Sequence, residues 1–238
     1  MEIKGFVKST LIDWEGKVAS ILWVGGCNFR CPYCYATDLV LNPSGLPTVS
    51  PQEVTGFLEE KKKWIDGVVI CGGEPTIHSD LSQFIQAFKK IPVAVKLDTN
   101  GTNPDLLKSL IKDRLIDYIA MDLKAPLDSK YNEIAGVNVN LEKIRETIDI
   151  LLNGDLDYEF RTTVCPAFLA KEDIIKMASS IGSARRYILQ QFKPGECMNK
   201  QINKVTPYTS GQLEDIKKEA KKFCPNIYLR GDSRGNTK

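Results

Sequence analysis

Three cysteines stand close together in the first part of the chain. Cys27, Cys31 and Cys34 have the spacing Cys-x3-Cys-x2-Cys and directly follow two glycines. Structural zinc takes four protein ligands, and an iron–sulfur cluster normally takes four cysteines. Three thiolates therefore predict a [4Fe–4S] cluster with one iron open to a small chelating molecule. Two alternatives remain, namely zinc with a distant fourth ligand and three buried apolar thiols.

The composition argues against several other kinds of site. The chain has 238 residues, with 32 Lys and Arg against 30 Asp and Glu, so the net charge is +2. Such a balance gives little reason to expect nucleic acid or an anionic membrane as the main partner. The single histidine, His78, argues against a His-rich metal site or a His-dependent triad. We expect His78 at the surface or as a cap.

The same sequence indicates the compartment. No apolar leader opens the chain, and the longest apolar run, 18–24, is too short to cross a bilayer. The number of cysteines is odd, seven in all. We therefore expect a cytoplasmic protein without structural disulfides.

Short apolar runs alternate with amphipathic stretches along most of the chain. Buried strands are predicted at 18–24, 67–71, 93–98, 117–123, 158–164 and 187–192. Helices are predicted at about 51–63, 79–90, 103–114, 141–153 and 171–181, with Ser50-Pro51 as a clear start signal. This alternation predicts an α/β fold with parallel strands, arranged as a barrel or as part of one. Functional residues are then expected at the C-terminal ends of the strands.

We expect a single domain over 1–238. Residues 1–17 would add a hairpin or edge strand, and 207–238 a peripheral helix (210–223) and strand (226–230), with a frayed end from 233. The remaining cysteines share no ligand spacing and are expected to be small buried residues: Cys71, Cys165, Cys197 and Cys224. The tryptophans are expected in the core or as staples: Trp14, Trp23 and Trp64.

The cysteine motif, with Tyr33 before its last cysteine, resembles the signature of the radical S-adenosylmethionine (SAM) superfamily. Gly72-Gly73-Glu74-Pro75 is similar to the family's motif for the SAM amino group. Further matches follow the later strands: Asp98-Thr99-Asn100-Gly101, Met121-Asp122-Leu123-Lys124 and Arg161-Thr162-Thr163-Val164. Together they look like the activating enzymes of glycyl-radical proteins, and most like the activating proteins of anaerobic ribonucleoside-triphosphate reductase.

The resemblance implies a fold and a set of site residues. The fold would be a partial (β/α)6 TIM-like barrel, with the cluster at the C-terminal end of its first barrel strand. Cys27, Cys31 and Cys34 would bind the metal. SAM contacts would come from Tyr33, Gly72, Gly73, Glu74, Asn100, Asp122, Lys124 and Arg161. A monovalent cation would lie by Asp98 and Asp122. Physically, a carboxylate suits the SAM ammonium and cations suit its carboxylate, although Lys124 and Arg161 could equally form ordinary salt bridges.

The resemblance also implies an anaerobic activity. A [4Fe–4S] cluster would cleave SAM reductively to a 5′-deoxyadenosyl radical, which would abstract a glycine Cα hydrogen from a partner enzyme. That partner would be a glycyl-radical enzyme, most simply anaerobic ribonucleotide reductase, and the electron would come from a ferredoxin or flavodoxin. No nucleic acid or membrane is expected.

Two other functions stay open. The same chemistry could act on a small molecule or a nucleoside, as in relatives that make deazapurines or modify tRNA. Alternatively, the chain could be a zinc- or cluster-stapled scaffold without catalysis. Three ligands instead of four, and glycine and carboxylate motifs at several strand ends, argue against the scaffold.

Overall fold

A computed structural model describes residues 1–231. The chain forms two compact units. The first comprises Met1–Asn28, Ala36–Thr99 and Asn103–Ala120, and the second comprises Phe29–Tyr35, Asn100–Thr102 and the chain from Met121 onward. The single domain over 1–238 stays a prediction.

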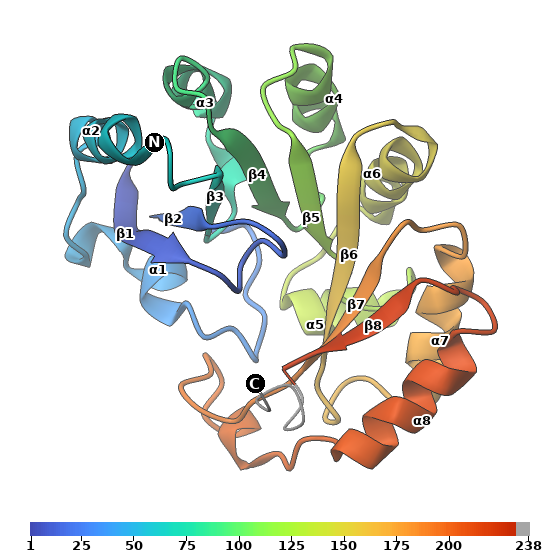
Figure 1. Ribbon diagram of the computed structural model, residues 1–238. Coiled ribbons are helices and arrows are strands. Elements are labelled where there is room, and N and C mark those ends of the chain that lie inside the picture. The colour runs from blue at the N-terminus through green and yellow to red at the C-terminus, as the bar shows by residue number, and fades with distance from the viewer. Residues whose placement is uncertain (232–238) are drawn as a thin grey trace. The chain divides into compact units, whose positions relative to one another are not determined.

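The first unit contains β1 to β4, the start of β5 and the helices between them (Figure 1). β1 (Ile3–Thr10) pairs antiparallel with β2 (Ala19–Val24), so the expected N-terminal edge strand is confirmed. β2 pairs in parallel with β3 (Gly67–Gly72), which pairs in parallel with β4 (Ala94–Thr99). These strands are almost entirely buried, which explains why their sequences are apolar without polar alternation.

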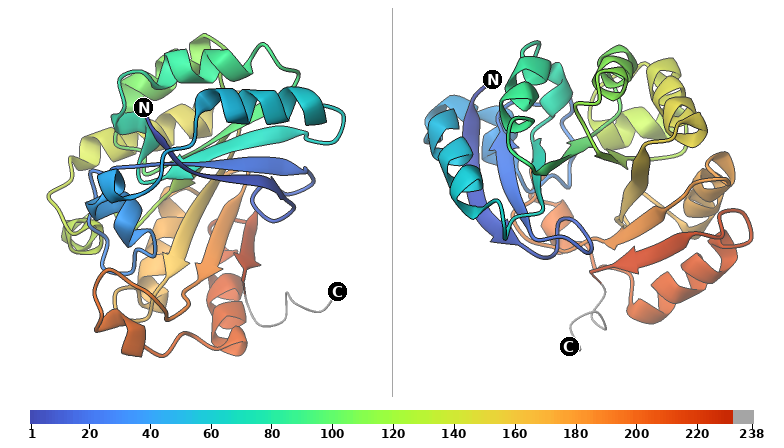
Figure 2. Two further views of the ribbon diagram at one scale, coloured as in Figure 1. Left: turned by 90° about the vertical axis from the view of Figure 1, so that its left-hand side faces the viewer. Right: turned by 45° about the horizontal axis from the view of Figure 1, so that its top comes forward.

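Helices connect these parallel strands. They are α1 (Thr37–Leu41), α2 (Pro51–Lys61), α3 (Leu81–Phe88) and α4 (Pro104–Lys112). Ser50 caps α2 as predicted, because its side chain accepts a hydrogen bond from Glu53 N at 3.1 Å. The N-terminal ammonium pairs with Asp80 just before α3. Figure 2 marks the N-terminus where the chain enters β1. Trp14 packs with Ala19, Ile21 and Val69 in the core of this unit.

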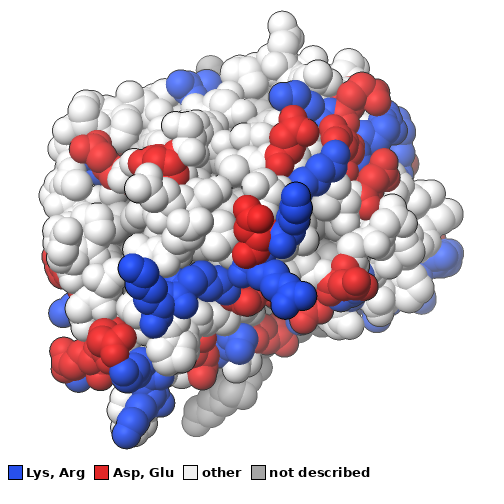
Figure 3. Space-filling view, turned by 90° about the horizontal axis from the view of Figure 1, so that it is seen from above, with Lys and Arg blue, Asp and Glu red and all other residues white. Residues whose placement is uncertain are grey.

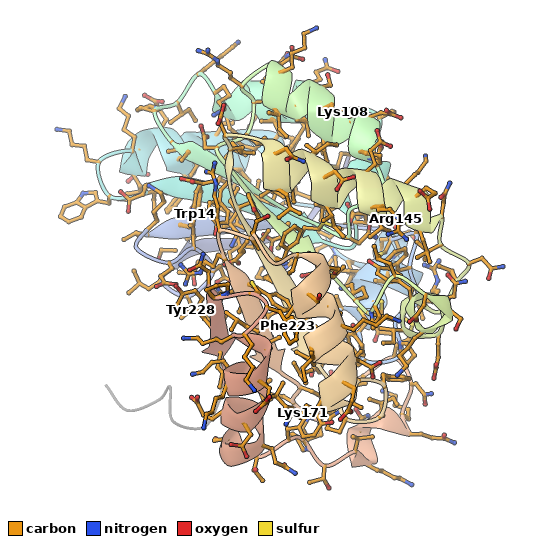
Figure 4. All side chains as sticks on the ribbon, turned by 90° about the vertical axis from the view of Figure 1, so that its right-hand side faces the viewer. Trp14, Lys108, Arg145, Lys171, Phe223 and Tyr228 are labelled. Atoms are coloured by element: carbon orange, nitrogen blue, oxygen red, sulfur yellow. The ribbon has the colours of Figure 1, made fainter. Side chains whose placement is uncertain are left out.

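β5 (Tyr118–Asp122) begins in the first unit and ends in the second. In the second unit, β6 (Asp157–Val164), β7 (Tyr187–Gln191) and β8 (Ile227–Arg230) are parallel neighbours. Its helices are α5 (Ser129–Ala135), α6 (Leu141–Asn153), α7 (Lys171–Ser180) and α8 (Ser210–Ala220). Figure 4 labels Lys171 at the start of α7 and Phe223 just after α8. The peripheral C-terminal helix and strand are thus present, whereas the fraying expected from 233 lies outside the described residues.

Each of the six predicted strands begins and ends within one residue of its prediction. The α/β class with parallel strands is confirmed. The sequence missed the short helices α1 and α5. Cys165, Cys197 and Cys224 are buried as expected, while Cys71 is half-buried. The prediction of a core or staple residue is wrong for Trp64, whose side chain is 76% exposed in the α2–β3 connection.

The surface agrees with the small net charge. On the face shown in Figure 3, acidic and basic side chains of the described residues are intermixed, with a row of Lys and Arg across the lower part and much uncharged surface. Within residues 1–231, no helix combines the length and the apolar character needed to span a bilayer.

Candidate functional site

In the first unit, the loop after β3 is bonded to the loop after β2. Gly73 N donates to Val24 O at 2.9 Å, and Glu74 N donates to Gly26 O at 2.8 Å. A Cβ on Gly73 would lie 1.8 Å from Gly26 O, so no other residue fits there without moving the backbone. Gly72 has φ +123, a conformation open to glycine. The Gly-Gly pair therefore fixes the close approach of the two loops.

Glu74 is buried, with 1% of its surface exposed. Its Oε1 accepts hydrogen bonds from Thr76 N at 3.1 Å, from the Thr76 hydroxyl at 2.5 Å and from the Thr99 hydroxyl at 2.7 Å. These three donors are neutral and hold the carboxylate in one orientation. A carboxylate fixed in this way is suited to bind a ligand ammonium, the role predicted for Glu74.

Asp98 lies near the end of β4, beside a buried lysine. Lys96 Nζ is 3.8 Å from Asp98 Oδ1 and donates to Asp13 O at 2.7 Å. The same ammonium lies 5.3 Å from the centre of the Tyr118 ring. Lys96 thus places a positive charge next to Asp98 within the first unit itself.

In the second unit, Asp122 lies between two cations. Its Oδ2 accepts from Lys124 Nζ at 3.0 Å, and its Oδ1 accepts from Arg161 Nε at 2.9 Å. Burial raises the pKa of Asp122, but the charges of Arg161 and Lys124 outweigh this and lower it to about 2. Both predicted cations are thus brought together on one carboxylate, and the triad carries one net positive charge.

The cysteine segment is divided between the units. Cys27 belongs to the first, and Cys31 and Cys34 belong to the second. Cys31 is buried, whereas Cys27 and Cys34 are half-buried. Burial raises the pKa of the Cys31 thiol, and the charge of Lys124 opposes that shift. In the second unit, therefore, a cation acts on the thiol that would have to ionise to bind iron.

Distant parts of the second unit hold Phe29–Tyr35. Arg30 N donates to Ala135 O at 2.7 Å, at the end of α5. From the other side, Met198 N donates to Cys34 O and Asn199 N donates to Pro32 O, both at 2.9 Å. The cysteine loop is therefore fixed by backbone hydrogen bonds from two separate segments.

Tyr33 is buried, and its ring centre lies 6.1 Å from that of Phe168. Its hydroxyl has no hydrogen-bond partner among the described residues. An unsatisfied buried hydroxyl is uncommon. Tyr33 directly precedes Cys34 in the sequence. Its hydroxyl is therefore a group near the motif to which a bound ligand or a water molecule can form a hydrogen bond.

The side chain of Asn100 binds the turn that follows β4. Its Oδ1 accepts from Thr102 N at 3.1 Å and from the Thr102 hydroxyl at 2.7 Å. Gly101 follows with φ +78, and its carbonyl accepts from the Thr147 hydroxyl at 2.8 Å. Asn100 thus shapes the turn after β4.

The fit of these residues to a cluster rests on donor chemistry. All seven cysteines are thiols outside any disulfide. Across residues 1–231, no three Cys, His, Asp or Glu side chains are gathered as they would be around a bound ion. Thiols are the usual ligands of iron–sulfur clusters, so the three cysteines of the motif have the right donor chemistry for one.

Two contributors went unnoticed in the sequence, namely the hydroxyls of Thr76 and Thr99, which orient Glu74. The sequence singled out His78 as a surface or capping residue, but it did not indicate that the His78 ring contacts Gly25 O at 2.9 Å. Residue spacing gives no signal for such contacts, because they join segments that meet only after folding.

The family of the chain follows from comparison with known proteins. The family model described as "Radical SAM superfamily" matches residues 21–180. This match covers both the cysteine motif and the Gly-Gly-Glu loop, and the chain belongs to that superfamily. It is therefore an enzyme of the radical SAM class.

One relative is similar over nearly its whole length. It is a protein of Methanocaldococcus jannaschii named "Putative glycyl-radical enzyme activating enzyme", 32% identical over 96% of this chain and 95% of its own. A Pyrococcus horikoshii protein named "Probable GTP 3',8-cyclase" is 31% identical, over 57% of this chain and 44% of its own.

A solved structure supports the fold. The crystal structure of Streptococcus suis SuiB matches with a TM-score of 0.69 and 17% identity, covering 89% of this chain. This chain spans about half of SuiB, 48% of its length. The match confirms the expected open, barrel-like α/β fold.

Proposed function

We propose that this chain is the activating enzyme of a glycyl-radical protein. The observation that carries the proposal is the similarity to a protein named as such an enzyme over almost the full length of both chains. The cysteine loop and the two charged groups at the strand ends support it. Anaerobic ribonucleotide reductase is the partner that we propose first, with a ferredoxin or flavodoxin as the electron donor.

In this proposal Cys27, Cys31 and Cys34 hold a [4Fe–4S] cluster. When bound, the cluster supplies the electron that cleaves SAM to a 5′-deoxyadenosyl radical, which takes a hydrogen atom from a glycine Cα of the partner. Glu74 would receive the SAM ammonium, because its carboxylate is buried and already oriented by neutral hydroxyls.

The Lys124–Asp122–Arg161 triad would receive the SAM carboxylate. Its net positive charge persists after Asp122 has been paired with both cations. Tyr33, Gly72, Gly73 and Asn100 are the further SAM contacts in this proposal. We leave a monovalent cation out of the proposal, because Asp98 already has Lys96 nearby and Asp122 has Lys124 and Arg161.

The proposal is tested by anaerobic reconstitution with iron and sulfide. We expect a [4Fe–4S]+ signal by electron paramagnetic resonance (EPR) that shifts when SAM is added, and 5′-deoxyadenosine as a product. Incubation with a candidate reductase should then give the doublet of a glycyl radical. A colourless protein that binds zinc would overturn the cluster assignment.

The second candidate is action on a small molecule or nucleoside. It is favoured by the similarity to proteins named as GTP 3',8-cyclases, although those matches cover less of both chains. SAM cleavage that is stimulated by GTP, with no glycyl doublet on any reductase, would support this second function.

A further inference from the structure

His78 makes a hydrogen bond that the proposed function does not use. Its Nε2 lies 2.9 Å from the carbonyl oxygen of Gly25. A carbonyl oxygen only accepts, so Nε2 carries the hydrogen and donates it. Gly25 precedes Cys27 by two residues and belongs to the same unit.

This bond belongs to a set of three. The carbonyls of Val24, Gly25 and Gly26 accept in turn from Gly73 N, from His78 Nε2 and from Glu74 N, at 2.9, 2.9 and 2.8 Å. Every carbonyl in the three residues before Cys27 is therefore bound by the segment that follows β3. Two of the donors are backbone amides, and the third is the imidazole.

The imidazole is itself held in place. His78 ends the short 3-10 turn Pro75–Ile77, with His78 N donating to Pro75 O at 3.2 Å. Leu81 N donates to His78 O at 3.2 Å, and Asn103 Nδ2 donates to Thr76 O at 2.9 Å within the same turn. The donor thus stands on a turn fixed at several points, as a group that positions a neighbouring segment must be.

We infer that His78 is a positioning residue for residues 24–27, the segment of the first unit that ends at Cys27. By holding the Gly25 carbonyl, it fixes the backbone that leads into Cys27. The hydrogen bond itself is independent of the proposed function, whereas its consequence for a cluster rests on that function.

The first test uses the apoprotein and hydrogen–deuterium exchange. The reporters are the amides of Gly26, which donates to Leu39 O at 2.7 Å, and of Glu74. In His78→Leu both amides should exchange about fivefold faster, the effect of losing roughly one hydrogen bond. His78→Gln, which can present an amide donor at similar reach, should restore the protection. Ser79→Ala, at the exposed neighbouring position, is the matched control and should exchange like the parent.

The second test uses the reconstituted protein. Iron release to a chelator should be about fivefold faster in His78→Leu than in the parent, and within twofold of the parent in His78→Gln. The EPR shift on adding SAM should be restored in the glutamine variant as well. If His78→Leu matches the parent in exchange and in iron release, the inference is overturned. The same holds if the glutamine variant is as defective as the leucine variant.

Two outcomes need a further measurement, namely misfolding of His78→Leu and a parent protein that binds no cluster. If His78→Leu fails to fold, as judged by circular dichroism, His78→Asn replaces it. The shorter asparagine should fall short of Gly25 and behave poorly beside glutamine, and equal behaviour of the two amides would refute the inference. If the parent binds no cluster, the proposed function fails, while the exchange experiment still decides whether His78 holds the loop.

Discussion

Arg161 Nε donates a hydrogen bond to Asp122 Oδ1 at 2.9 Å and thereby joins the end of β5 to β6. Lys124 binds the other oxygen of the same carboxylate. One acidic group therefore holds two cations within the second unit. Removing it would leave two partly buried positive charges side by side, which is costly.

This arrangement predicts how stability depends on pH. The pKa of Asp122 falls from its usual 3.8 to about 2 on folding, so the unfolded chain takes up the proton first as the pH drops. Its contribution, about 2 kcal/mol, is complete above about pH 5 and is lost as the pH falls through about 2. In urea unfolding, Asp122→Asn should be destabilised at pH 7, and its difference from the parent should shrink at pH 3. A difference that is equal at both pH values would contradict this assignment.

Gly73 should tolerate no side chain. Because a Cβ would lie 1.8 Å from Gly26 O, Gly73→Ala must push apart the loops after β2 and β3. We expect a loss of about 2–4 kcal/mol in the free energy of unfolding, on the scale of overpacking and broken hydrogen bonds. Gly56→Ala is the matched control, because that glycine lies in α2 with open space around its Cβ position. The control should gain about 0.5–1 kcal/mol. A stable Gly73→Ala would mean that the two loops do not approach this closely.

Substitution of a motif cysteine and of a buried cysteine outside the motif should have different effects on metal binding. Cys31→Ala should lose the reconstituted iron and all SAM cleavage. Cys224→Ala should keep both, because Cys224 is buried beside β8 and has no part in the motif. The measurement is iron and sulfide content per chain, followed by 5′-deoxyadenosine production. Parent-level 5′-deoxyadenosine from Cys31→Ala would remove Cys31 from the ligand set.

The charged groups predict independence from monovalent cations. Asp98 lies 3.8 Å from Lys96, and Asp122 contacts Lys124 and Arg161. Exchange of potassium for choline at constant ionic strength should therefore change the rate of SAM cleavage less than twofold. Lys96→Met, which removes the cation near Asp98, should make the rate sensitive to potassium. Strong dependence on potassium in the parent would restore a bound cation to the site.

The sequence predicted those parts of the fold that depend on the type of residue at each position. The strands were located within one residue, because buried parallel strands need continuous apolar runs. Ser50 marked the start of α2 through its capping side chain. The prediction for Trp64 was wrong. An aromatic residue close to a helix end is typically a packing residue, but the Trp64 side chain is 76% exposed.

The contacts within the candidate site could not be predicted from the sequence as well as the strands could. The positions of Glu74 and Asp122 could be named, but not what holds them. Thr99 reaches Glu74 across 25 positions and Arg161 reaches Asp122 across 39. Contacts of this kind depend on which strands become neighbours, and no local pattern encodes the hydroxyl or guanidinium that arrives there.

The cysteine loop also sets an order of events during synthesis. Cys34 and Pro32 receive their hydrogen bonds from Met198 and Asn199, residues made more than 160 positions later. On the ribosome the motif therefore emerges long before the segment that shapes it. A nascent chain can therefore display all three cysteines before it contains the residues that hold Pro32 and Cys34 in place.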